Sequence, residues 1–371
     1  MAKKDSKEPK SSSSSSRDQI KALLASSDEH FNNTEDIYYK VSTGSLILDM
    51  HSSGGLTPGV HRFCGINEGG KTSAALEVAR NFQIQIPNSK VVYVKAEGRF
   101  SKEIMERSGL DMSEDKWFLL ESNVYEFVFD FIKALIKDNE DEIRYLFIID
   151  SMDGLITRGD LEKGLSDATK VAGGAVIGAA FLKRVSNAMS KFGHMCIMIS
   201  QVRETIKIDP YAKTGFKNTT ASGGNALLHY ANFIFEFEGR YQKDWILQDP
   251  DQRYDEKKNK IIGHEVRITI KKSPNEKTNT VISYPIKYGR KNGTSIWRER
   301  ELRDLLFENG QFVKSGAWTT VDPSVIKQLK ELKIECPEKF QGRDSILEFM
   351  EKSPEFVEYW YKRFKAALFP E

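Results

Sequence analysis

The sequence predicts an α/β fold with a mainly parallel central sheet flanked by helices, an N-terminal helix and a small helical C-terminal domain. Short apolar runs alternate with helical stretches through the first half of the chain, which is typical of parallel sheets. A glycine-rich loop stands between the first of these runs and Ser73–Arg80, a stretch of good helix formers. With 371 residues, the chain is long enough for a substantial core and additional small domains.

The charge is balanced and cysteine is rare. Lys and Arg number 55 against 53 Asp and Glu, a net charge of +2 that neither demands nor excludes nucleic acid. Cys64, Cys196 and Cys336 are far apart and lack metal spacing, so we expect buried thiols without disulfides. No apolar run approaches the ~20 residues of a membrane span, and no apolar segment follows the N-terminal lysines as in a secretory signal. We therefore expect a cytoplasmic protein without membrane contact.

The N-terminal region divides into a tail and a helix. Residues 1–17 are rich in Lys and Ser, which predicts a disordered basic tail. From Asp18, a candidate N-cap, Ile20, Leu23 and Leu24 follow at helical spacing. Because a lone short helix is marginal in water, the apolar face over 18–39 should dock on its own domain or on a neighbouring molecule. We interpret 18–39 as an oligomerisation helix and linker.

The main α/β domain is expected over residues 40–321. Strands are predicted at Val60–Cys64, Lys90–Val94, Tyr145–Ile149, Met195–Ile199, Phe233–Phe237, Val266–Ile270 and Val281–Ile286. The first four alternate with helices and favour a parallel sheet. The short connections between the later strands favour antiparallel additions at one edge. Asp322-Pro323 should end this core, and 322–371 should form the small helical domain.

The octapeptide Gly65–Thr72 fits G-x-x-x-x-G-K-[ST], the phosphate-binding P-loop. Loop amides and the following helix N-terminus would bind the phosphates of ATP. The nucleotide-binding candidates are Gly65, Ile66, Asn67, Glu68, Gly69, Gly70, Lys71, Thr72 and Ser73. Lys71 would reach the β- and γ-phosphates, and the Thr72 hydroxyl would hold Mg²⁺. Glu68 brings a negative charge close to the phosphates, which is unfavourable unless its side chain points away.

Further candidates follow the ends of predicted strands. Tyr145–Ile149 ends in Asp150, a Walker B arrangement that would orient the Mg²⁺ shell. Glu97 follows another strand and is a candidate general base, with a solvated loop carboxylate as the alternative. Gln201 follows Met195–Ile199 and could sense the γ-phosphate.

Two segments at the same sheet edge are candidates for DNA contact. Val202–Thr220 is long and polar and interleaves basic with aromatic residues, which suits single-stranded nucleic acid; an ordinary solvated loop is the alternative. Thr157–Gly164 has mixed charge. The DNA-binding candidates are Arg158, Lys163, Arg203, Lys207, Tyr211, Lys213, Phe216, Lys217, Gly223, Gly224 and Asn225.

Several stretches together resemble the RecA family of bacterial and phage recombinases, over roughly residues 20–368. The matching segments are Ser42–Asp49 with Gly54–Leu56 before the P-loop, Ala96-Glu97, Asp150-Ser151, Gln201–Arg203, Thr219–Leu227, Lys314–Trp318 and Gln341–Arg343. The P-loop occurs in many families, whereas Thr219–Leu227 and Lys314–Trp318 are far more specific. The resemblance implies an ATP-dependent filament on single-stranded DNA that pairs it with homologous double-stranded DNA and exchanges strands. It also implies single-strand-binding and mediator proteins as accessory partners.

The resemblance further implies that Lys271 and Lys272 reach the γ-phosphate across a subunit interface. Ser273 stands where the family often has a second lysine, and a solvated strand end is the alternative. Lys95 stands where the family usually has an acid, and Gly239–Gly263 looks extended. These departures suggest a phage-encoded or otherwise atypical bacterial recombinase, to which repressor-cleavage roles are not carried over.

Two other functions compete with this interpretation. A ring motor such as a helicase shares the P-loop and Walker B but needs neither Lys314–Trp318 nor the N-terminal helix. A DNA-binding protein with a decayed ATP site is disfavoured because Lys71, Thr72, Glu97 and Asp150 are all present.

Overall fold

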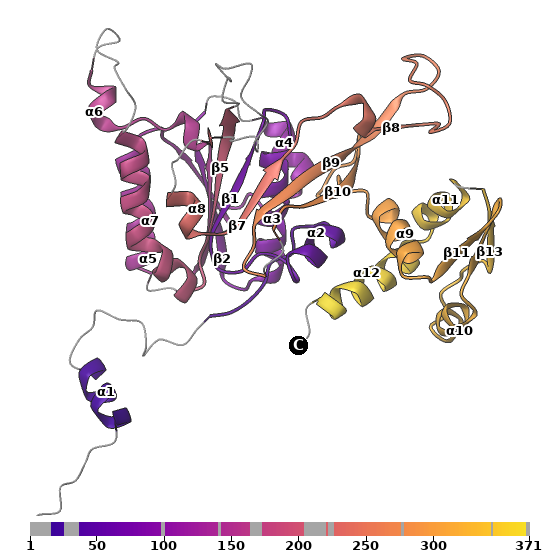
Figure 1. The fold of residues 1–371 in the computed structure, drawn as a ribbon, viewed down its shortest axis with the longest axis horizontal. Helices are drawn as coiled ribbons and strands as arrows, with labels where there is room; N and C mark the ends of the chain where they lie inside the picture. Colours follow the sequence, from indigo (N-terminus) through magenta and orange to yellow (C-terminus); the bar gives the residue numbers. More distant parts are fainter. Residues whose placement is uncertain are drawn as a thin grey trace, which may run out of the picture.

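The computed structural model is built around a large sheet with helices on both faces (Figure 1). It describes residues 16–25, 37–97, 101–139, 142–163, 173–203, 220–221, 226–275, 278–342 and 344–368. The sheet order is β10 (Thr280–Lys287), β9 (Ile261–Lys272), β7 (Ala231–Phe237), β1 (Gly59–Gly65), β5 (Met195–Arg203), β4 (Arg144–Asp150), β2 (Ser89–Lys95) and β3 (Trp117–Glu121). Two short strands join this path, β6 (Thr220–Ala221) on β5 and β8 (Trp245–Leu247) on β9.

The strand directions confirm the predicted topology. The run from β7 through β1, β5, β4 and β2 to β3 is parallel throughout. β9 is antiparallel to β7 and to β10, so the late strands extend one edge. Parallel strands are buried on both faces, which explains why they read as nearly continuous apolar runs in the sequence.

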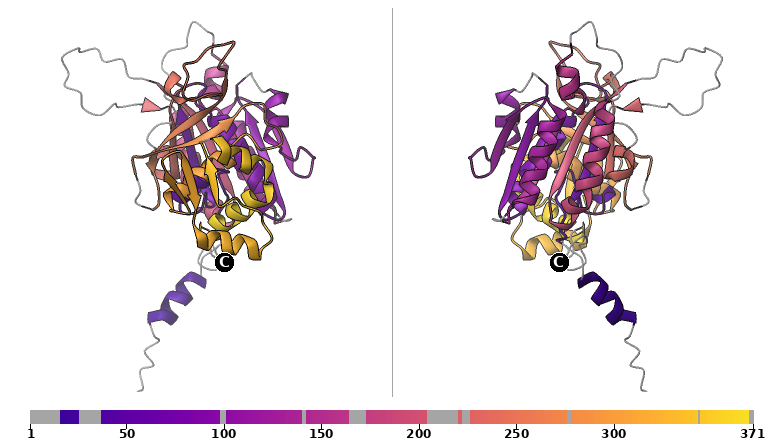
Figure 2. Two further views of the ribbon diagram at one scale, coloured as in Figure 1. Left: turned by 90° about the vertical axis from the view of Figure 1, so that its right-hand side faces the viewer. Right: turned by 90° about the vertical axis from the view of Figure 1, so that its left-hand side faces the viewer.

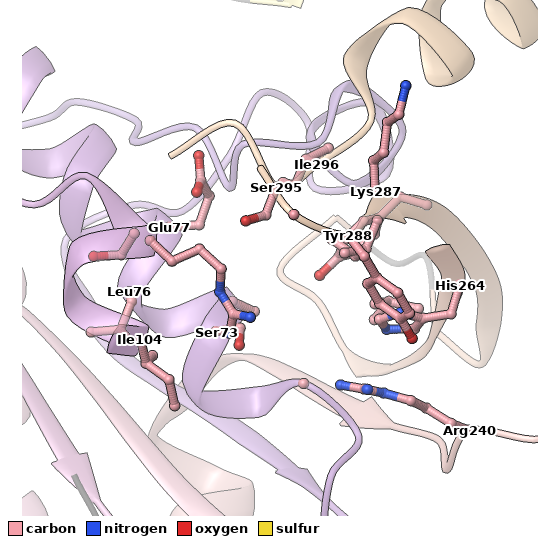
Figure 3. Close-up of a pocket in the computed structure, with 18 residues that line it drawn as sticks. Ser73, Leu76, Glu77, Ile104, Arg240, His264, Lys287, Tyr288, Ser295 and Ile296 are labelled. Atoms are coloured by element: carbon pink, nitrogen blue, oxygen red, sulfur yellow. The ribbon is translucent and has the colours of Figure 1, made fainter. Parts of the chain in front are cut away.

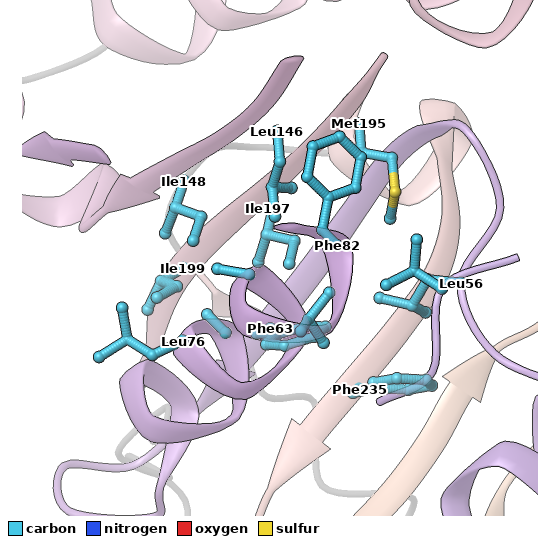
Figure 4. Close-up of a cluster of buried hydrophobic side chains, with 14 of the residues drawn as sticks. Leu56, Phe63, Leu76, Phe82, Leu146, Ile148, Met195, Ile197, Ile199 and Phe235 are labelled. Carbon is cyan, nitrogen blue, oxygen red and sulfur yellow. The ribbon is translucent and has the colours of Figure 1, made fainter. Parts of the chain in front are cut away.

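Helices cover the two faces of the sheet and form two hydrophobic clusters. One face carries α2 (Leu46–His51), α3 (Lys71–Gln85) and α4 (Lys102–Ser108), and the other carries α5 (Tyr125–Lys137), α7 (Gly173–Lys191) and α8 (Ala226–Tyr230). Figure 4 shows Leu76 and Phe82 of α3 packed against Ile148 of β4 and Ile197 of β5. This packing places the first turn of α3, which follows the P-loop, at the carboxyl ends of β1 and β4.

The C-terminal part contains a sheet as well as helices. Its elements are α9 (Arg298–Glu308), β11 (Phe312–Ser315), β12 (Trp318–Val321), α10 (Pro323–Glu331), β13 (Lys339–Gln341), α11 (Asp344–Lys352) and α12 (Pro354–Leu368). The predicted small helical domain therefore also contains a small sheet, which was not predicted because strands of three or four residues with mostly exposed side chains leave little hydrophobic signal. Asp322 caps α10 as a helix start. The hydrophobic cluster of this C-terminal part includes Leu302 and Phe312, which precede the predicted domain boundary at residue 322.

Local corrections concern helix and strand ends. Asp18 is not the N-cap but lies in the first turn of α1 (Ser16–Ala25), so the helix takes in the last two residues of the predicted tail. Figures 1 and 2 show α1 apart from the core. β5 continues to Arg203, so Gln201 lies within the strand and does not follow it. β3 was not predicted. Part of the candidate loop Thr157–Gly164 is the short helix α6 (Arg158–Leu161).

None of the helices within these described ranges is long and apolar enough to cross a membrane.

Candidate functional site

The P-loop joins β1 to α3 and depends on two glycines. Gly65 has φ +146, and a Cβ there would lie 2.2 Å from the Phe237 carbonyl oxygen. Gly70 has φ +99 and caps α3. A side chain at either position would strain the backbone, so glycine is required. Glu68 has φ 61, and its side chain is exposed.

Lys71 is folded beneath the loop. Its Nζ donates to the carbonyl oxygens of Gly65 (3.0 Å) and Ile66 (2.6 Å). Burial lowers the pKa of Lys71, an effect opposed by the carboxylates of Asp150, Asp153 and Glu97. Main-chain carbonyls are weak partners for an ammonium group, so phosphate oxygens could replace them readily.

Asp150 is held by two hydroxyl groups. Its Oδ2 accepts hydrogen bonds from Thr72 Oγ1 (2.7 Å) and from Tyr93 OH (2.5 Å). A hydroxyl beside a carboxylate fits Mg²⁺, which is usually held by one or two carboxylates together with substrate phosphates. No group of three or more His, Cys, Asp or Glu side chains suited to a metal occurs in the described ranges. Thr72 and Asp150 are therefore the residues that would hold the ion, with the nucleotide completing its shell.

The structure brings Glu97 and Gln201 to this edge of the sheet. Glu97 lies two residues beyond β2, is exposed, and accepts a short hydrogen bond from Ser151 Oγ. Gln201 is in register with Gly65 of the P-loop, and its main-chain N–H donates to Asp153 Oδ2 (2.7 Å). Both residues lie at the predicted sheet edge, although Gln201 is still within β5; their chemical roles stay predictions.

Lys271 and Lys272 each contact groups of their own chain. Lys271 Nζ lies 3.0 Å from Glu236 Oε2 on β7. Lys272 Nζ donates to the carbonyl oxygens of Leu228 (2.7 Å) and His229 (2.8 Å) in α8. The role of these lysines at a γ-phosphate across a subunit interface stays a prediction.

The candidate DNA segments are only partly described. Lys207, Tyr211, Lys213, Phe216, Lys217, Gly223, Gly224 and Asn225 lie outside the described residues. The backbone of Arg203 ends β5 and pairs with Thr220 of β6, so the longer segment leaves the sheet two residues after Gln201. Arg158 is exposed, and Lys163 forms an ion pair with Asp160 (2.8 Å), which compensates part of its charge.

A cavity of about 190 Å³ lies beside the first turns of α3 and was missed by the sequence analysis. Figure 3 shows Ser73 and Ile104 on one side of it and His264, Tyr288 and Ile296 on the other, with Arg240 nearby. Neither ring nitrogen of the buried His264 has a hydrogen-bond partner among the described residues, and burial lowers its pKa to about 4. The side of the cavity formed by β9 and β10 was not predicted, because these strands are far from the P-loop in the sequence. The sequence feature that could have indicated it is Tyr288-Gly289, which follows a predicted strand.

Comparisons with known proteins agree with this geometry. The family model described as the RecA N-terminal domain matches residues 25–288. Among curated proteins, Protein RecA of Nostoc sp. is 25% identical over 319 residues, which cover 86% of this chain and 78% of the relative. Protein RecA of Rhodospirillum centenum is 26% identical over 78% of this chain and 74% of the relative. Protein RecA of Mycobacterium ulcerans is 27% identical over 78% of this chain and 76% of the relative.

Proposed function

We propose that this chain, which belongs to the RecA family, is an ATP-dependent recombinase that forms helical filaments on single-stranded DNA and catalyses homologous pairing and strand exchange. The family relationship supports a RecA-like, DNA-dependent ATPase in general. One observation supports the more specific proposal of a DNA recombinase. Lys71, Thr72 and Asp150 lie at the same sheet edge as the start of the segment that follows Gln201.

In the proposed mechanism, the P-loop amides and the α3 N-terminus hold the ATP phosphates. Lys71 exchanges its two carbonyl partners for phosphate oxygens. Thr72 and Asp150 would hold Mg²⁺, which would neutralise charge on the phosphates. Glu97 accepts a proton from the attacking water, because its exposed carboxylate stands beside the same edge. The cavity bordered by Ser73 and Tyr288 receives the base.

The proposed link to DNA runs along β5. Gln201 is in register with the P-loop, and only Val202 and Arg203 separate it from the segment that carries Phe216. A contact between Gln201 and the γ-phosphate would therefore reposition the DNA-binding segment with little intervening chain. Lys271 and Lys272 would act on the nucleotide of the next subunit.

Two apolar surfaces support self-association. β3 ends the sheet on one side, and edge strands invite pairing with another chain. Phe118 of β3 is 45% exposed, and its ring stacks on Phe131. α1 exposes Ile20 (57%) and Leu23 (71%). We infer that α1 of one subunit docks against the β3 edge of the next, which would propagate a filament.

ATP hydrolysis with and without single-stranded DNA, followed on samples imaged by negative-stain microscopy, tests the proposal. We expect strong stimulation by DNA together with helical filaments. Unstimulated hydrolysis or closed rings would instead indicate a ring motor.

Replacing Phe216 with alanine tests the DNA-binding segment. We expect single-stranded DNA affinity to fall by about 1–3 kcal/mol, the scale of one base–aromatic stack, while ATP binding stays near normal. Tyr241→Ala, an exposed aromatic outside this segment, is the matched control. Wild-type DNA binding and strand exchange by the Phe216→Ala variant would remove this segment from the interface.

A further inference from the structure

Three charged residues lie side by side where β3, β2 and β4 end. Lys95 is in register with Glu121 on one neighbouring strand and with Asp150 on the other. Neighbouring strands lie about 4.8 Å apart, so a lysine between two carboxylates is within reach of both. The row at this sheet edge is therefore acid, base, acid.

All three residues belong to the face of the sheet that α3 covers. Side chains two residues apart in a strand share a face. Tyr93 and Ile148, which precede Lys95 and Asp150 by two positions, pack in the α3 cluster, and Leu119 before Glu121 packs against it. Tyr93 also donates to Asp150, on the same face as Thr72. Lys95 thus emerges on the side of the sheet that carries the candidate Mg²⁺ ligands.

Lys95 is paired with the outer acid of the row. Its Nζ lies 2.7 Å from Glu121 Oε1. The Glu121 side chain is 64% exposed and that of Lys95 is 23% exposed, so solvent screens the pair and it contributes little to folding. Asp150 Oδ2, in contrast, accepts from the neutral hydroxyls of Thr72 and Tyr93. Such hydroxyl donors leave the negative charge of Asp150 available to a divalent cation.

We propose that Glu121 is a positioning residue that holds Lys95 away from Asp150 and thereby sets the affinity of the nucleotide site for Mg²⁺. Without Glu121, the Lys95 ammonium would turn to Asp150, the nearest remaining carboxylate in its row. It would then compete with the metal ion for the carboxylate that should orient the metal shell. This proposal rests on the assignment of Thr72 and Asp150 as Mg²⁺ ligands in the proposed function.

Mg²⁺ titrations of nucleotide binding test the proposal directly. The full-length protein is mixed with a fluorescent ATP analogue, and bound analogue is followed as MgCl₂ is added, so the readout does not depend on catalysis. For Glu121→Gln we expect the half-saturating Mg²⁺ concentration to rise about fivefold, the effect of one unit charge at ~4 Å in water. For Lys95→Met we expect a value equal to or below that of the wild type.

The double variant Lys95→Met/Glu121→Gln separates positioning from a direct effect of the Glu121 charge. We expect its half-saturating Mg²⁺ concentration to equal that of Lys95→Met, because without the Lys95 ammonium there is no group for Glu121 to position. A fivefold rise that persists in the double variant would overturn the proposal, since the Glu121 charge would then act on the metal by itself. Glu114→Gln, which removes an exposed carboxylate elsewhere, controls for net charge.

Two further outcomes separate the role of Glu121 from the assignment of Thr72 and Asp150 as Mg²⁺ ligands. Mg²⁺-dependent binding by the wild type with an unchanged midpoint in Glu121→Gln would overturn the role of Glu121 and leave the nucleotide site standing. Absence of Mg²⁺-dependent binding in the wild type and in Lys95→Met alike would overturn the Mg²⁺ site and this proposal with it.

Discussion

Two clusters of polar and charged side chains border α3, and they differ in exposure. The nucleotide cluster, Lys71, Thr72, Glu97 and Asp150, lies at the open edge of the sheet. The second cluster, which we call the buried joint, consists of Ser45, Asp49, Glu77, Glu301 and Tyr361 and connects α2 and α3 to α9 and α12.

Two carboxylates of the buried joint are sealed from solvent. Asp49 and Glu301 have no exposed surface, and burial raises the pKa of Asp49 to about 6 and that of Glu301 to about 7. Glu301 Oε1 accepts from Ser45 Oγ (2.5 Å) and from the Ile47 main-chain N–H (3.1 Å). Tyr361 OH donates to the Gly44 carbonyl oxygen (2.6 Å).

The comparison shows that carboxylates alone do not mark a functional site. In the nucleotide cluster, Glu97 is exposed and Asp150 is partly exposed, so a ligand can reach them. In the buried joint, Asp49 and Glu301 are surrounded by internal donors and have no exposed surface, which fits a role in holding the C-terminal helices. The predictions below test this division between ligand binding and stability.

The largest effect is expected from Lys71→Ala, which should affect function alone. Loss of a charge that stabilises the transition state should reduce the rate of ATP hydrolysis by at least about 100-fold. The free energy of unfolding without nucleotide should change by less than about 1 kcal/mol, because the cost of burying the Lys71 ammonium offsets its two hydrogen bonds to loop carbonyls. Steady-state hydrolysis and urea unfolding measure the two, with the exposed Lys133→Ala as control. A near-normal rate of ATP hydrolysis by Lys71→Ala would contradict the assignment of this cluster to ligand binding.

Glu301→Ala should affect stability alone. It leaves the donors of Ser45 and Ile47 buried without their acceptor, which should lower the free energy of unfolding by about 1–3 kcal/mol. Urea denaturation measures this, and Glu301→Gln, which keeps an acceptor oxygen, should lose less. An Ala variant as stable as the wild type would show that the joint does not hold α9.

The pH dependence of stability should differ between the wild type and Glu301→Gln. The folded-state pKa of Glu301 is raised from 4.5 to about 7, so the folded state retains a proton that the unfolded state has lost. Stability therefore falls as pH rises from about 4.5 to about 7, by at most ~1.4 kcal/mol per pH unit for this group. Urea titrations at pH 5, 6, 7 and 8 should show the free energy of unfolding of Glu301→Gln rising relative to that of the wild type as pH increases. A constant difference would contradict the raised pKa.

The smallest effect is expected from Tyr361→Phe. It removes the hydrogen bond to Gly44 and keeps the ring, whose centroid lies 3.6 Å from the Arg298 guanidinium carbon. The free energy of unfolding should fall by about 1 kcal/mol with ATP hydrolysis unchanged. Thermal unfolding and hydrolysis assays check both, and a drop in hydrolysis without loss of stability would link the joint to the nucleotide site.

Most of the central sheet could be predicted, and β3 could not. Each predicted strand is an apolar run that matches a parallel or antiparallel strand, with ends shifted by up to five residues, as for Ile261–Lys272. Trp117–Glu121 is short and lies on the outside of the sheet, so its pattern is weak. Tyr93 was also missed as a partner of Asp150, although strand alternation places it on the same face as Lys95.

The sequence by itself determined the sheet core and the phosphate loop, because both depend on local patterns: apolar runs of strand length, and eight residues whose glycines meet a backbone requirement. Only the tertiary structure decided the cavity wall at His264 and Tyr288, the Glu121–Lys95–Asp150 row and the buried joint. These sites combine residues up to 317 positions apart, as for Gly44 and Tyr361, and their polar groups become partners only when packing brings the elements together and removes water.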